Sequence, residues 1–278
     1  MKNSHRGATL GAVVMAMSLA ACGSGEPASS SSSQTEAGDR TIKVGVKFDQ
    51  PGLGLKQGAD YAGFDIDVAN YIADKLGVTP EYVQASVSQR ETLIQTGQVD
   101  YIVGTYVITD PRKEKVSFAG PYFIAGQDLL VRADDASITG VESLTGKKLC
   151  SVKGSTSTDV LLEMNPEINL QEYDSDALCV DALRSGAVDA HTSEDVILAG
   201  FAAQPANAGK LRVVGNPFST EEYGVGLRKG DTELCQQITD ALDEFVSSGE
   251  WQKSVEKNFG AAGFKPGADN PPTPAPCA

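Results

Sequence analysis

The sequence predicts an α/β fold made of two similar lobes, each a mostly parallel sheet flanked by helices. From Thr41 onward, runs rich in β-branched residues alternate with runs of helical periodicity, which is typical of parallel sheets covered by helices. Two pairs of short segments also recur in the same order along the chain. This repetition indicates two lobes of about 90 residues that share one plan, followed by further helices.

The first lobe is expected to begin with a strand and a helix. The strand is TIKVGVKF, residues 41–48, in which β-branched and apolar residues dominate. The helix is GFDIDVANYIADKLG, residues 63–77, and its apolar face consists of Ile66, Ala69, Ile72, Ala73 and Leu76. Asp65 and Asp67 lie in the first turn, where the helix dipole favours acidic side chains, and Gly77 is the expected C-terminal cap.

The second lobe is expected to repeat this plan. The alternation of strand-like and helix-like runs continues to residues 127–134, restarts at residues 147–154 and extends to residues 211–215. IQTGQVDYIVGT at 94–105 and LRSGAVDAHTSE at 183–194 share an apolar residue, a glycine and Val-Asp. Each indicates a helix that ends at glycine and returns into a strand; VGVKFD and CSVKGS form a looser second pair. Ligands of such sheets bind beyond the carboxyl ends of the strands, here between the lobes.

The N-terminal residues predict export. Lys2 and Arg6 are followed by an apolar run at residues 8–20 that is too short to span a bilayer comfortably. This order is typical of a signal peptide, here residues 1–21, which takes no part in the fold.

The residues that follow predict a membrane anchor. Leu-Ala-Ala-Cys at residues 19–22 resembles a bacterial lipobox, in which Cys22 is diacylated and becomes the mature N-terminus. An ordinary signal peptide with an incidental cysteine is the alternative. Residues 22–40 carry Ser, Gly, Glu and Pro without apolar periodicity, so we expect a flexible tether that keeps a folded domain near the outer face of the cell membrane.

The formal net charge of −14 argues against functions that depend on a basic surface. Removal of residues 1–21 takes away Lys2 and Arg6 and no acidic residue, so the mature chain carries −16. Such a surface repels nucleic acid and anionic membranes, and we expect no nucleic-acid partner. The two histidines, His5 and His191, cannot build a histidine-rich metal site, and we expect neither a metal nor a cofactor.

The cysteines after Cys22 predict two disulfides. An even number of cysteines in an exported chain is typical of a disulfide framework with three possible pairings, here among Cys150, Cys179, Cys235 and Cys277. Cys150 and Cys179 lie in the same expected lobe, which favours pairing them. Cys235 would then pair with Cys277 and hold down the Pro-rich C-terminal tail. Metal binding is the alternative, but no two cysteines have the C-x-x-C spacing.

Several segments resemble the extracellular solute-binding proteins that serve polar amino-acid ABC importers. They are GFDIDVANYIADKL, TYVITDPRKEKVSFAGPYFIAGQDLLV, GSTS and VDAHTSEDVILAG, in the order typical of that family. The resemblance covers residues 41–277. KVGVKFDQPGLGL and the cysteine placement are similar to the glutamate-binding lipoprotein branch.

This resemblance implies a type II periplasmic-binding-protein-like fold, a two-lobed clamp with two crossover strands near residues 125–132 and 219–228. The first lobe would comprise residues 41–128 and 222–278, and the second lobe residues 129–221. It also implies a lipid-anchored monomer that delivers L-glutamate or a related amino acid to an ABC permease in the cytoplasmic membrane.

The resemblance further implies which residues hold the ligand's α-carboxylate. Arg112 would hold it, because a guanidinium presents two donors in the plane of a carboxylate; a surface ion pair is the alternative. Backbone N–H groups near Ser155 and Thr156, at the start of a helix, would hold the same carboxylate, unless this segment is only a helix cap. Thr105 would add a hydroxyl. Val107 stands where the family usually has Ser or Thr, so one hydroxyl contact is lost.

Four further residues are implied for the other ligand groups. Glu194 occupies the position of the family's aspartate for the α-amino group, with Asp195 as the second candidate; both could instead be solvated acids that open a helix. Lys47 and Arg90 match positions where binders of acidic amino acids place cations. A buried acidic side chain needs such a partner, so the two cations favour L-glutamate, with aspartate second. Lys47 and Arg90 could also simply face solvent.

Three alternative functions are kept open. A neutral ligand such as glutamine, or another polar amino acid, would leave the positive charge partly unpaired. A dehydratase-type enzyme of the same fold would need an acid–base set, but His191 lies inside an expected strand, so we expect no enzyme. A surface sensor of the same fold would dock to a different membrane protein.

Overall fold

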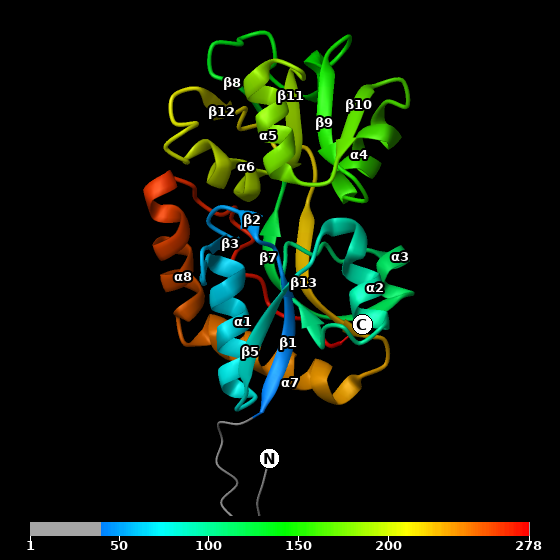
Figure 1. Ribbon diagram of the computed structural model, residues 1–278, viewed down its shortest axis with the longest axis vertical. Helices are drawn as coiled ribbons and strands as arrows, with labels where there is room; N and C mark the ends of the chain where they lie inside the picture. The colour runs from blue at the N-terminus through cyan, green and yellow to red at the C-terminus, as the bar shows by residue number, and fades with distance from the viewer. Residues whose placement is uncertain (1–39, 278) are drawn as a thin grey trace, which may run out of the picture. The chain divides into compact units, whose positions relative to one another are not determined.

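The computed structural model describes residues 40–277. The expected signal peptide, the lipidation site Cys22 and the expected tether up to residue 39 lie outside these described residues. Residues 40–277 form two lobes within one compact unit (Figure 1). In this part of the chain, no helix is both long enough and apolar enough to cross a membrane.

The first lobe is built on a five-stranded sheet with the order β5-β1-β6-β13-β7. Its strands are β1 (Thr41–Val46), β5 (Thr79–Gln84), β6 (Tyr101–Ile102), β7 (Val116–Ala125) and β13 (Glu221–Arg228). Its helices are α1 (Phe64–Lys75), α2 (Arg90–Gln95), α3 (Asp110–Lys113), α7 (Thr232–Ser247) and α8 (Glu250–Phe259), with 3-10 turns at Val87–Gln89 and Gly260–Ala262. A small antiparallel sheet consists of β2 (Asp49–Gln50), β3 (Gly54–Gln57) and β4 (Asp60–Ala62).

The second lobe is built on a sheet with the order β10-β9-β11-β8-β12. Its strands are β8 (Gln127–Arg132), β9 (Lys148–Val152), β10 (Asn169–Tyr173), β11 (Ala190–Glu194) and β12 (Leu211–Val213). Its helices are α4 (Thr156–Met164), α5 (Asp176–Ser185) and α6 (Asp195–Ala202), with a 3-10 turn at Val141–Ser143. Figure 1 shows this lobe above the first one.

The two sheets have the same plan, which confirms the repeat expected from the sequence. β1, β5 and β6 run parallel to one another, as do β9, β10 and β11. In each sheet a single strand opposes its neighbours: β13 lies antiparallel between β6 and β7, and β8 lies antiparallel between β11 and β12. The sheets are therefore mostly parallel, and the two opposed strands are those by which the chain passes into each lobe.

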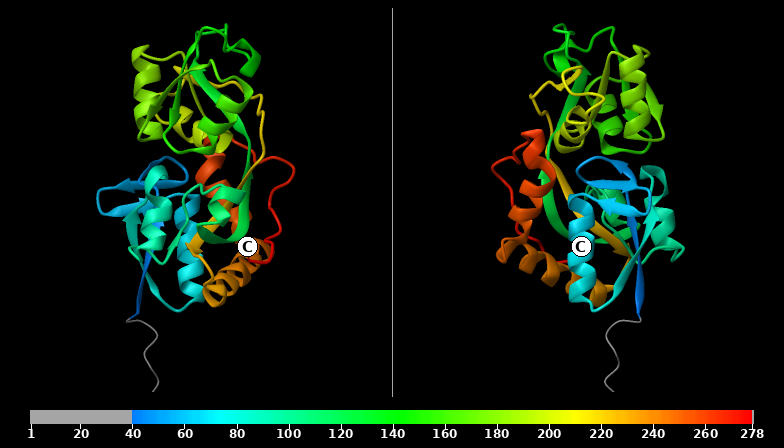
Figure 2. Two further views of the ribbon diagram at one scale, coloured as in Figure 1. Left: turned by 90° about the vertical axis from the view of Figure 1, so that its right-hand side faces the viewer. Right: turned by 60° about the vertical axis from the view of Figure 1, so that its left-hand side comes forward.

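Two segments connect the lobes, as both views in Figure 2 show. β7 of the first lobe is followed by β8 of the second after the single residue Gly126, and the chain returns between β12 and β13. Gln127 pairs with Glu194 in the second sheet, whereas Glu221 pairs with Ala125 in the first. The strand pairing thus changes from one sheet to the other around Gly126 and just before Glu221.

Helix α1 forms where the apolar periodicity predicted it. Its expected apolar face is buried against the sheet, with Leu76 partly buried just after the last turn. Gly77 follows with a φ of +65°, a left-handed conformation that glycine adopts without strain. The Gly77 N–H donates to the carbonyl of Asp74 and the Val78 N–H donates to that of Ala73, each at 3.0 Å, which closes the helix end.

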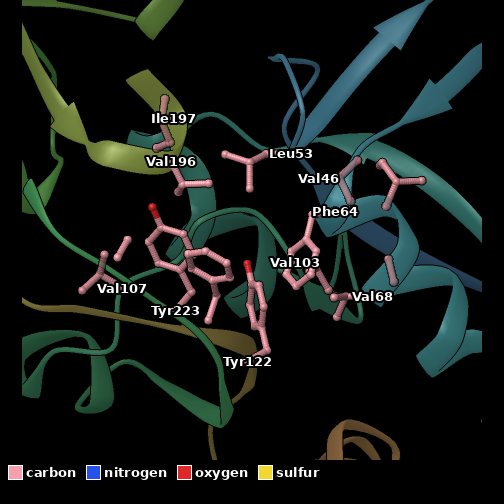
Figure 3. Packing of buried hydrophobic residues seen from close by; sticks show 14 of the residues in the cluster. Val46, Leu53, Phe64, Val68, Val103, Val107, Tyr122, Val196, Ile197 and Tyr223 are labelled. Carbon is pink, nitrogen blue, oxygen red and sulfur yellow. The ribbon is translucent and has the colours of Figure 1, made fainter. Parts of the chain in front are cut away.

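One hydrophobic cluster extends from the first lobe into the second. Figure 3 shows Val196 and Ile197 of α6 near Leu53 and Tyr223, which belong to the first lobe. All four side chains are buried. Helix α6 is therefore the part of the second lobe that shares apolar packing with the first.

A glycine permits the close approach of α6 to the first lobe. A Cβ atom built on Gly200 of α6 would lie 2.1 Å from the carbonyl oxygen of Pro51, which follows β2. No side chain fits at that distance. The contact between the lobes seen here thus depends on a residue without a Cβ at position 200.

Both favoured disulfides are present. Cys150 is bonded to Cys179 within the second lobe, and Cys235 of α7 is bonded to Cys277. The C-terminal tail lies along β7, since the Ala275 N–H donates to the carbonyl of Gly120 at 2.8 Å. The Asn270 side chain also exchanges two hydrogen bonds with the backbone of Ile124. These contacts confirm the expectation that the bond to Cys277 holds down the tail.

Candidate functional site

A cavity lies between the lobes and is lined by side chains from both. Five of the eight expected ligand-binding residues line it: Arg90, Thr105, Ser155, Thr156 and Glu194. The other three, Lys47, Arg112 and Asp195, lie outside its lining. Its volume is about 20 Å³, which is room for about one or two water molecules. An amino acid can enter only when the lobes, or the side chains that line the cavity, move apart.

A second cavity opens beside the first and has a volume of about 670 Å³. Val87 of the first lobe and Thr156 of the second line both cavities. Arg112 lines this outer cavity together with Glu91 and Lys153. Arg112 therefore lies on the side of the inner cavity that is formed by the start of α4.

Arg112 is positioned by the short helix α3 and contacts both lobes. The Thr109 hydroxyl caps this helix by accepting a hydrogen bond from the Arg112 N–H at 3.4 Å. The guanidinium donates to the carbonyl of Val107 at 2.8 Å and, across the lobes, to that of Gly154 at 3.2 Å. Its acidic partner is Glu91 of α2, with Nε and Oε1 3.8 Å apart. The side chain thus joins α3 to the loop before α4.

Thr105 is held in a strained conformation at the cavity wall. Its φ of 46° lies in the left-handed region, which β-branched residues rarely adopt. Its N–H donates to Asp65 of α1 at 3.1 Å, and the Tyr122 hydroxyl donates to the same carboxylate at 2.9 Å. Burial raises the pKa of Asp65 to about 6. The Thr105 hydroxyl donates to the side-chain oxygen of Gln50 at 3.3 Å. From the sequence, Asp65 was expected only to interact favourably with the helix dipole. In the structure its carboxylate also holds the backbone of Thr105 at the cavity wall.

The start of α4 presents backbone donors toward the cavities. Ser155 is the N-cap of α4, and its hydroxyl accepts a hydrogen bond from the Thr158 N–H at 3.3 Å. The Ser155 N–H already donates to the carbonyl of Val152 at 3.0 Å. The N–H groups of Thr156 and Ser157 belong to the first turn, where an α-helix provides no acceptor. These two groups are therefore better placed to hold an anion than that of Ser155.

The side chains of Glu194 and Asp195 point to different parts of the structure. Glu194 ends β11, is buried, and lines the cavity. Burial, followed by the charges of Glu221 and Asp176, raises the pKa of Glu194 to about 7. The Asp195 carboxylate instead accepts hydrogen bonds from the Gly126 N–H at 3.3 Å and the Val196 N–H at 2.7 Å, and burial raises its pKa to about 6. Asp195 thus lies at the connection between β7 and β8, and only Glu194 faces the cavity.

Lys47 follows β1 and is buried close behind the cavity, with 2% of its surface exposed. Its ammonium nitrogen lies 4.0 Å from Oδ1 of Asp49. Burial lowers the pKa of Lys47, and the charges of Asp49 and Asp176 oppose that shift. Lys47 is therefore a buried basic residue paired with Asp49.

Arg90 lines the cavity and has no acidic partner within 4 Å among the described residues. Its Nη1 donates to the carbonyl oxygens of Gly104 and Thr105 at 3.0 Å each, and the guanidinium lies 4.2 Å from the centre of the Tyr106 ring. Its buried Nε has no hydrogen-bond partner in residues 40–277. Burial and the charge of Arg112 lower the pKa of Arg90 to about 10. Arg90 thus brings a positive charge to the cavity wall.

Three polar residues that line the cavity were not identified from the sequence: Gln50, Asp176 and Ser193. The Gln50 amide donates to Oδ2 of Asp176 at 2.9 Å, which connects the two lobes. The Ser193 hydroxyl lies 3.1 Å from Oδ1 of Asp176 and 3.1 Å from Oε2 of Glu194. Burial acts to raise the pKa of Asp176, but His191, Lys47 and Gln50 outweigh it and lower the value to about 2. Asp176 is therefore a buried anion.

His191 is fully buried and does not line the cavity. Its Nδ1 lies 3.2 Å from the carbonyl oxygen of Cys150, and its Nε2 lies 3.2 Å from Oδ1 of Asp176. His191 also lies beside the sulfur atoms of Cys150 and Cys179, but these are bonded to each other and cannot serve as thiolate ligands. The histidine supports Asp176 from behind and does not reach the cavity.

The sequence matches a family of known proteins over most of its length. The model of the bacterial extracellular solute-binding proteins, family 3, matches residues 42–261. The glutamate-binding protein GluB of Corynebacterium efficiens is 42% identical in an alignment that covers 91% of this chain and 90% of that protein. The glutamine-binding protein GlnH of an ABC transporter of Bacillus subtilis is 37% identical over 86% of this chain and 91% of its own length.

The fold also matches solved structures. An ancestral arginine-binding protein bound to glutamine superposes with a TM-score of 0.74 at 36% sequence identity, covering 79% of this chain and 98% of that one. The likeness confirms the two-lobed α/β fold expected from the sequence. It also places the cavity between the lobes within a fold that binds amino acids.

Proposed function

Because this chain belongs to the family 3 bacterial extracellular solute-binding proteins, we propose that it captures L-glutamate outside the cell and delivers it to the permease of an ABC importer. Its amino-acid-binding role follows from its relatives, and the choice of glutamate is our proposal. Aspartate, one methylene shorter, is the second candidate.

The observation that carries the proposal is the charge at the cavity. Arg90 brings a buried cation to its wall without an acidic partner within 4 Å among residues 40–277. Lys47 adds a second buried cation just behind. A buried carboxylate is stable only beside such charges, so these cations favour a ligand with an acidic side chain. The GluB relative, named for glutamate, supports the same choice.

The remaining groups suit the two ends of an amino acid. We assign the α-carboxylate to Arg112 and to the N–H groups that open α4, because a guanidinium and a helix start both favour anions. We assign the α-ammonium group to Glu194, the acidic residue of β11 that lines the cavity. Arg112 belongs to the first lobe and Glu194 to the second, so a bound amino acid would hold the lobes together.

We propose that binding proceeds by a hinged movement of the lobes about the segments around Gly126 and Glu221. The inner cavity is too small for an amino acid in the observed conformation, so the lobes must separate before binding and close afterwards. The ligand stabilises the closed shape because it binds groups on both lobes. The permease would recognise that shape, and no bond of the ligand is broken.

Glutamine is a further candidate, and one buried acidic residue favours it. Asp176 is buried and lines the cavity, and its negative charge suits an amide side chain better than a carboxylate. The relative GlnH is named for glutamine. An enzymatic function has less support, because His191 does not line the cavity.

A thermal unfolding screen tests the choice of ligand. A ligand that binds only the folded protein raises the melting temperature, and at one ligand concentration the rise increases with the logarithm of its affinity. We expect the largest rise with glutamate and smaller rises with aspartate and glutamine. A larger rise with arginine or cystine would contradict the proposal.

We also propose that the protein is anchored to the outer face of the cell membrane through Cys22 and acts as a monomer. Cys22→Ala should release the protein into the medium without a change in ligand affinity. Retention of the variant on cells would contradict the anchor. The molar mass in solution, measured by light scattering, tests the monomer.

A further inference from the structure

A buried acidic residue lines the cavity on the side of the expected cations. Asp176 is the first residue of α5 and has 2% of its surface exposed. Its two carboxylate oxygens are fully engaged: Oδ2 accepts from the Gln50 amide, and Oδ1 lies 3.2 Å from His191 Nε2 and 3.1 Å from the Ser193 hydroxyl. The start of α5 does not require these hydrogen bonds, because the Ser175 hydroxyl already caps the helix.

We propose that Asp176 is a specificity-determining residue: it holds Gln50 across the cavity and offsets part of the Lys47 charge, and so sets the preference between acidic and amide side chains. This inference rests on the proposed function and adds to it a residue that limits the selectivity for glutamate over glutamine.

The charges around the cavity support this role. Lys47 lies 4.0 Å from Asp49 and close enough to Asp176 for each charge to shift the pKa of the other. Lys47 is thus influenced by the charges of Asp49, Asp176 and Glu194, whereas Arg90 has no acidic group within 4 Å among residues 40–277 and is influenced by the charges of Glu91 and Glu194. The positive charge available to a ligand side chain comes mainly from Arg90, and Asp176 reduces the share contributed by Lys47.

Gln50 adds a geometric part to the argument. Its Nε2 donates to Asp176 and its Oε1 accepts from the Thr105 hydroxyl, so both ends of the amide are fixed. An amide held in this way cannot turn freely to present its donors to a ligand carboxylate. Asp176 therefore limits binding of an acidic side chain both by its charge and through Gln50.

The test compares glutamate and glutamine affinities in the wild-type protein and in Asp176→Asn. Asparagine has the same size and can still accept from Gln50, but it carries no charge. The ratio of glutamate to glutamine affinity should rise by roughly tenfold or more, because a repulsive charge beside an anionic side chain is removed. A ratio that stays within about threefold of wild type, or that falls, would overturn the inference, since a purely structural loss weakens both ligands alike.

Asp128→Asn is the matched control. Asp128 is a buried aspartate of the same lobe whose carboxylate accepts from the backbone N–H groups of Leu129 and Gly215, and it does not line the cavity. Its substitution should leave the ratio unchanged. A rise equal to that of Asp176→Asn would overturn the inference.

Asp176→Ser removes the same charge if Asp176→Asn does not fold, and its hydroxyl can still accept a hydrogen bond. The ratio should again rise roughly tenfold, because no anion remains beside an acidic side chain. An unchanged ratio would overturn the inference. Wild-type binding separates the two proposals: a wild-type protein that binds neither ligand refutes the proposed function itself, whereas unchanged ratios in a protein that binds glutamate refute only the role of Asp176.

Discussion

The side-chain amide of Gln50 in the first lobe donates a hydrogen bond to Oδ2 of Asp176 in the second lobe, with the two atoms 2.9 Å apart. The Arg112 guanidinium makes a second connection to the carbonyl of Gly154 at 3.2 Å. Gln50 and Asp176 line the inner cavity, and Arg112 and Gly154 line the outer one. The observed conformation is thus one in which the lobes meet across the expected ligand site.

Gly200→Ala should prevent the lobes from meeting in this way. The added Cβ would lie 2.1 Å from the carbonyl oxygen of Pro51, a distance that the observed contact between the lobes cannot accept. Since the ligand gains its affinity from the closed form, we expect affinity to fall by at least about tenfold. The decrease in radius of gyration on ligand binding, measured by small-angle X-ray scattering, should also disappear.

Gly267→Ala is the control for this variant. No atom lies within 4 Å of the position that a Cβ would take on Gly267, and its φ is not positive, so alanine fits there. This variant should bind ligand and close as the wild type does. Normal closure in Gly200→Ala would show that the contact between Gly200 and Pro51 is not part of the ligand-bound form.

Arg112→Ala should abolish measurable binding of any α-amino acid. Removal of one member of a buried, hydrogen-bonded charge pair costs about 2–5 kcal/mol, which is a factor of roughly 30 to several thousand in affinity. Arg112→Lys should also weaken binding by more than about tenfold, because an ammonium group cannot present two donors in the plane of a carboxylate. Calorimetry with glutamate measures both losses.

Arg184→Ala serves as the surface control for Arg112. The Arg184 side chain is exposed and forms a salt bridge with Asp181, one turn away in the same helix. Its loss should leave affinity unchanged. Near-normal binding by Arg112→Ala would refute the assignment of the α-carboxylate.

Ligand affinity should rise with pH between about 5.5 and 7.5. The pKa of Glu194 is raised to about 7, so below that pH much of this carboxyl is protonated and cannot pair with an ammonium group. Binding must then release a proton, and affinity should increase by up to about tenfold per pH unit below the pKa. Titrations in buffers of different ionisation enthalpy measure the proton release directly.

Glu194→Gln provides the control for this pH dependence. The variant should bind the ligand weakly, and its affinity should no longer rise between about pH 5.5 and 7.5. Burial raises the pKa of Glu194 above its ordinary value of 4.5, so this group's contribution to folding is lost as pH rises through about 7. Unliganded Glu194→Gln should therefore be more stable than wild type at pH 8. Equal stability there, with unchanged pH dependence of binding, would contradict the role of Glu194.

Loss of the Cys235–Cys277 disulfide should destabilise the protein without affecting the ligand site. The bond spans 42 residues, and closure of a loop of that length stabilises by about 4 kcal/mol on the chain-entropy model. Urea unfolding of the Cys235→Ala/Cys277→Ala variant should show a loss of about 2–4 kcal/mol. Glutamate affinity should change by less than about twofold, because neither cysteine lines a cavity of the site.

The repeated plan of the fold could be predicted from sequence because its signals are local. The helix–glycine–strand segments around Gly97 and Gly186 indicated two similar lobes, and they correspond to the passages from α2 to β6 and from α5 to β11. Cys150 and Cys179 could be paired because both lie in one lobe. The opposed strands β8 and β13 could not be predicted by periodicity alone, since a strand's direction depends on the distant partners beside it.

The cavity was only partly predictable for the same reason. Thr105 and Glu194 lie in segments that resemble the family, Arg90 matches a position where binders of acidic amino acids place a cation, and each lines the cavity. Gln50 and Asp176 are separated by 126 residues, and neither stands in a motif that indicates a contact between them. Their role emerges only when the lobes meet. Asp195 could not be separated from Glu194 by sequence, because adjacent residues at a strand end face opposite directions and only the sheet determines which faces the cavity.

Isothermal titration calorimetry of the purified protein with glutamate, aspartate and glutamine tests the central claim most directly. If Arg90 and Lys47 select an acidic side chain, glutamate should bind with a dissociation constant in the micromolar range or below, about 1 μM corresponding to 8 kcal/mol, and more tightly than glutamine. Aspartate should follow glutamate. Tighter binding of glutamine than of glutamate would contradict the account.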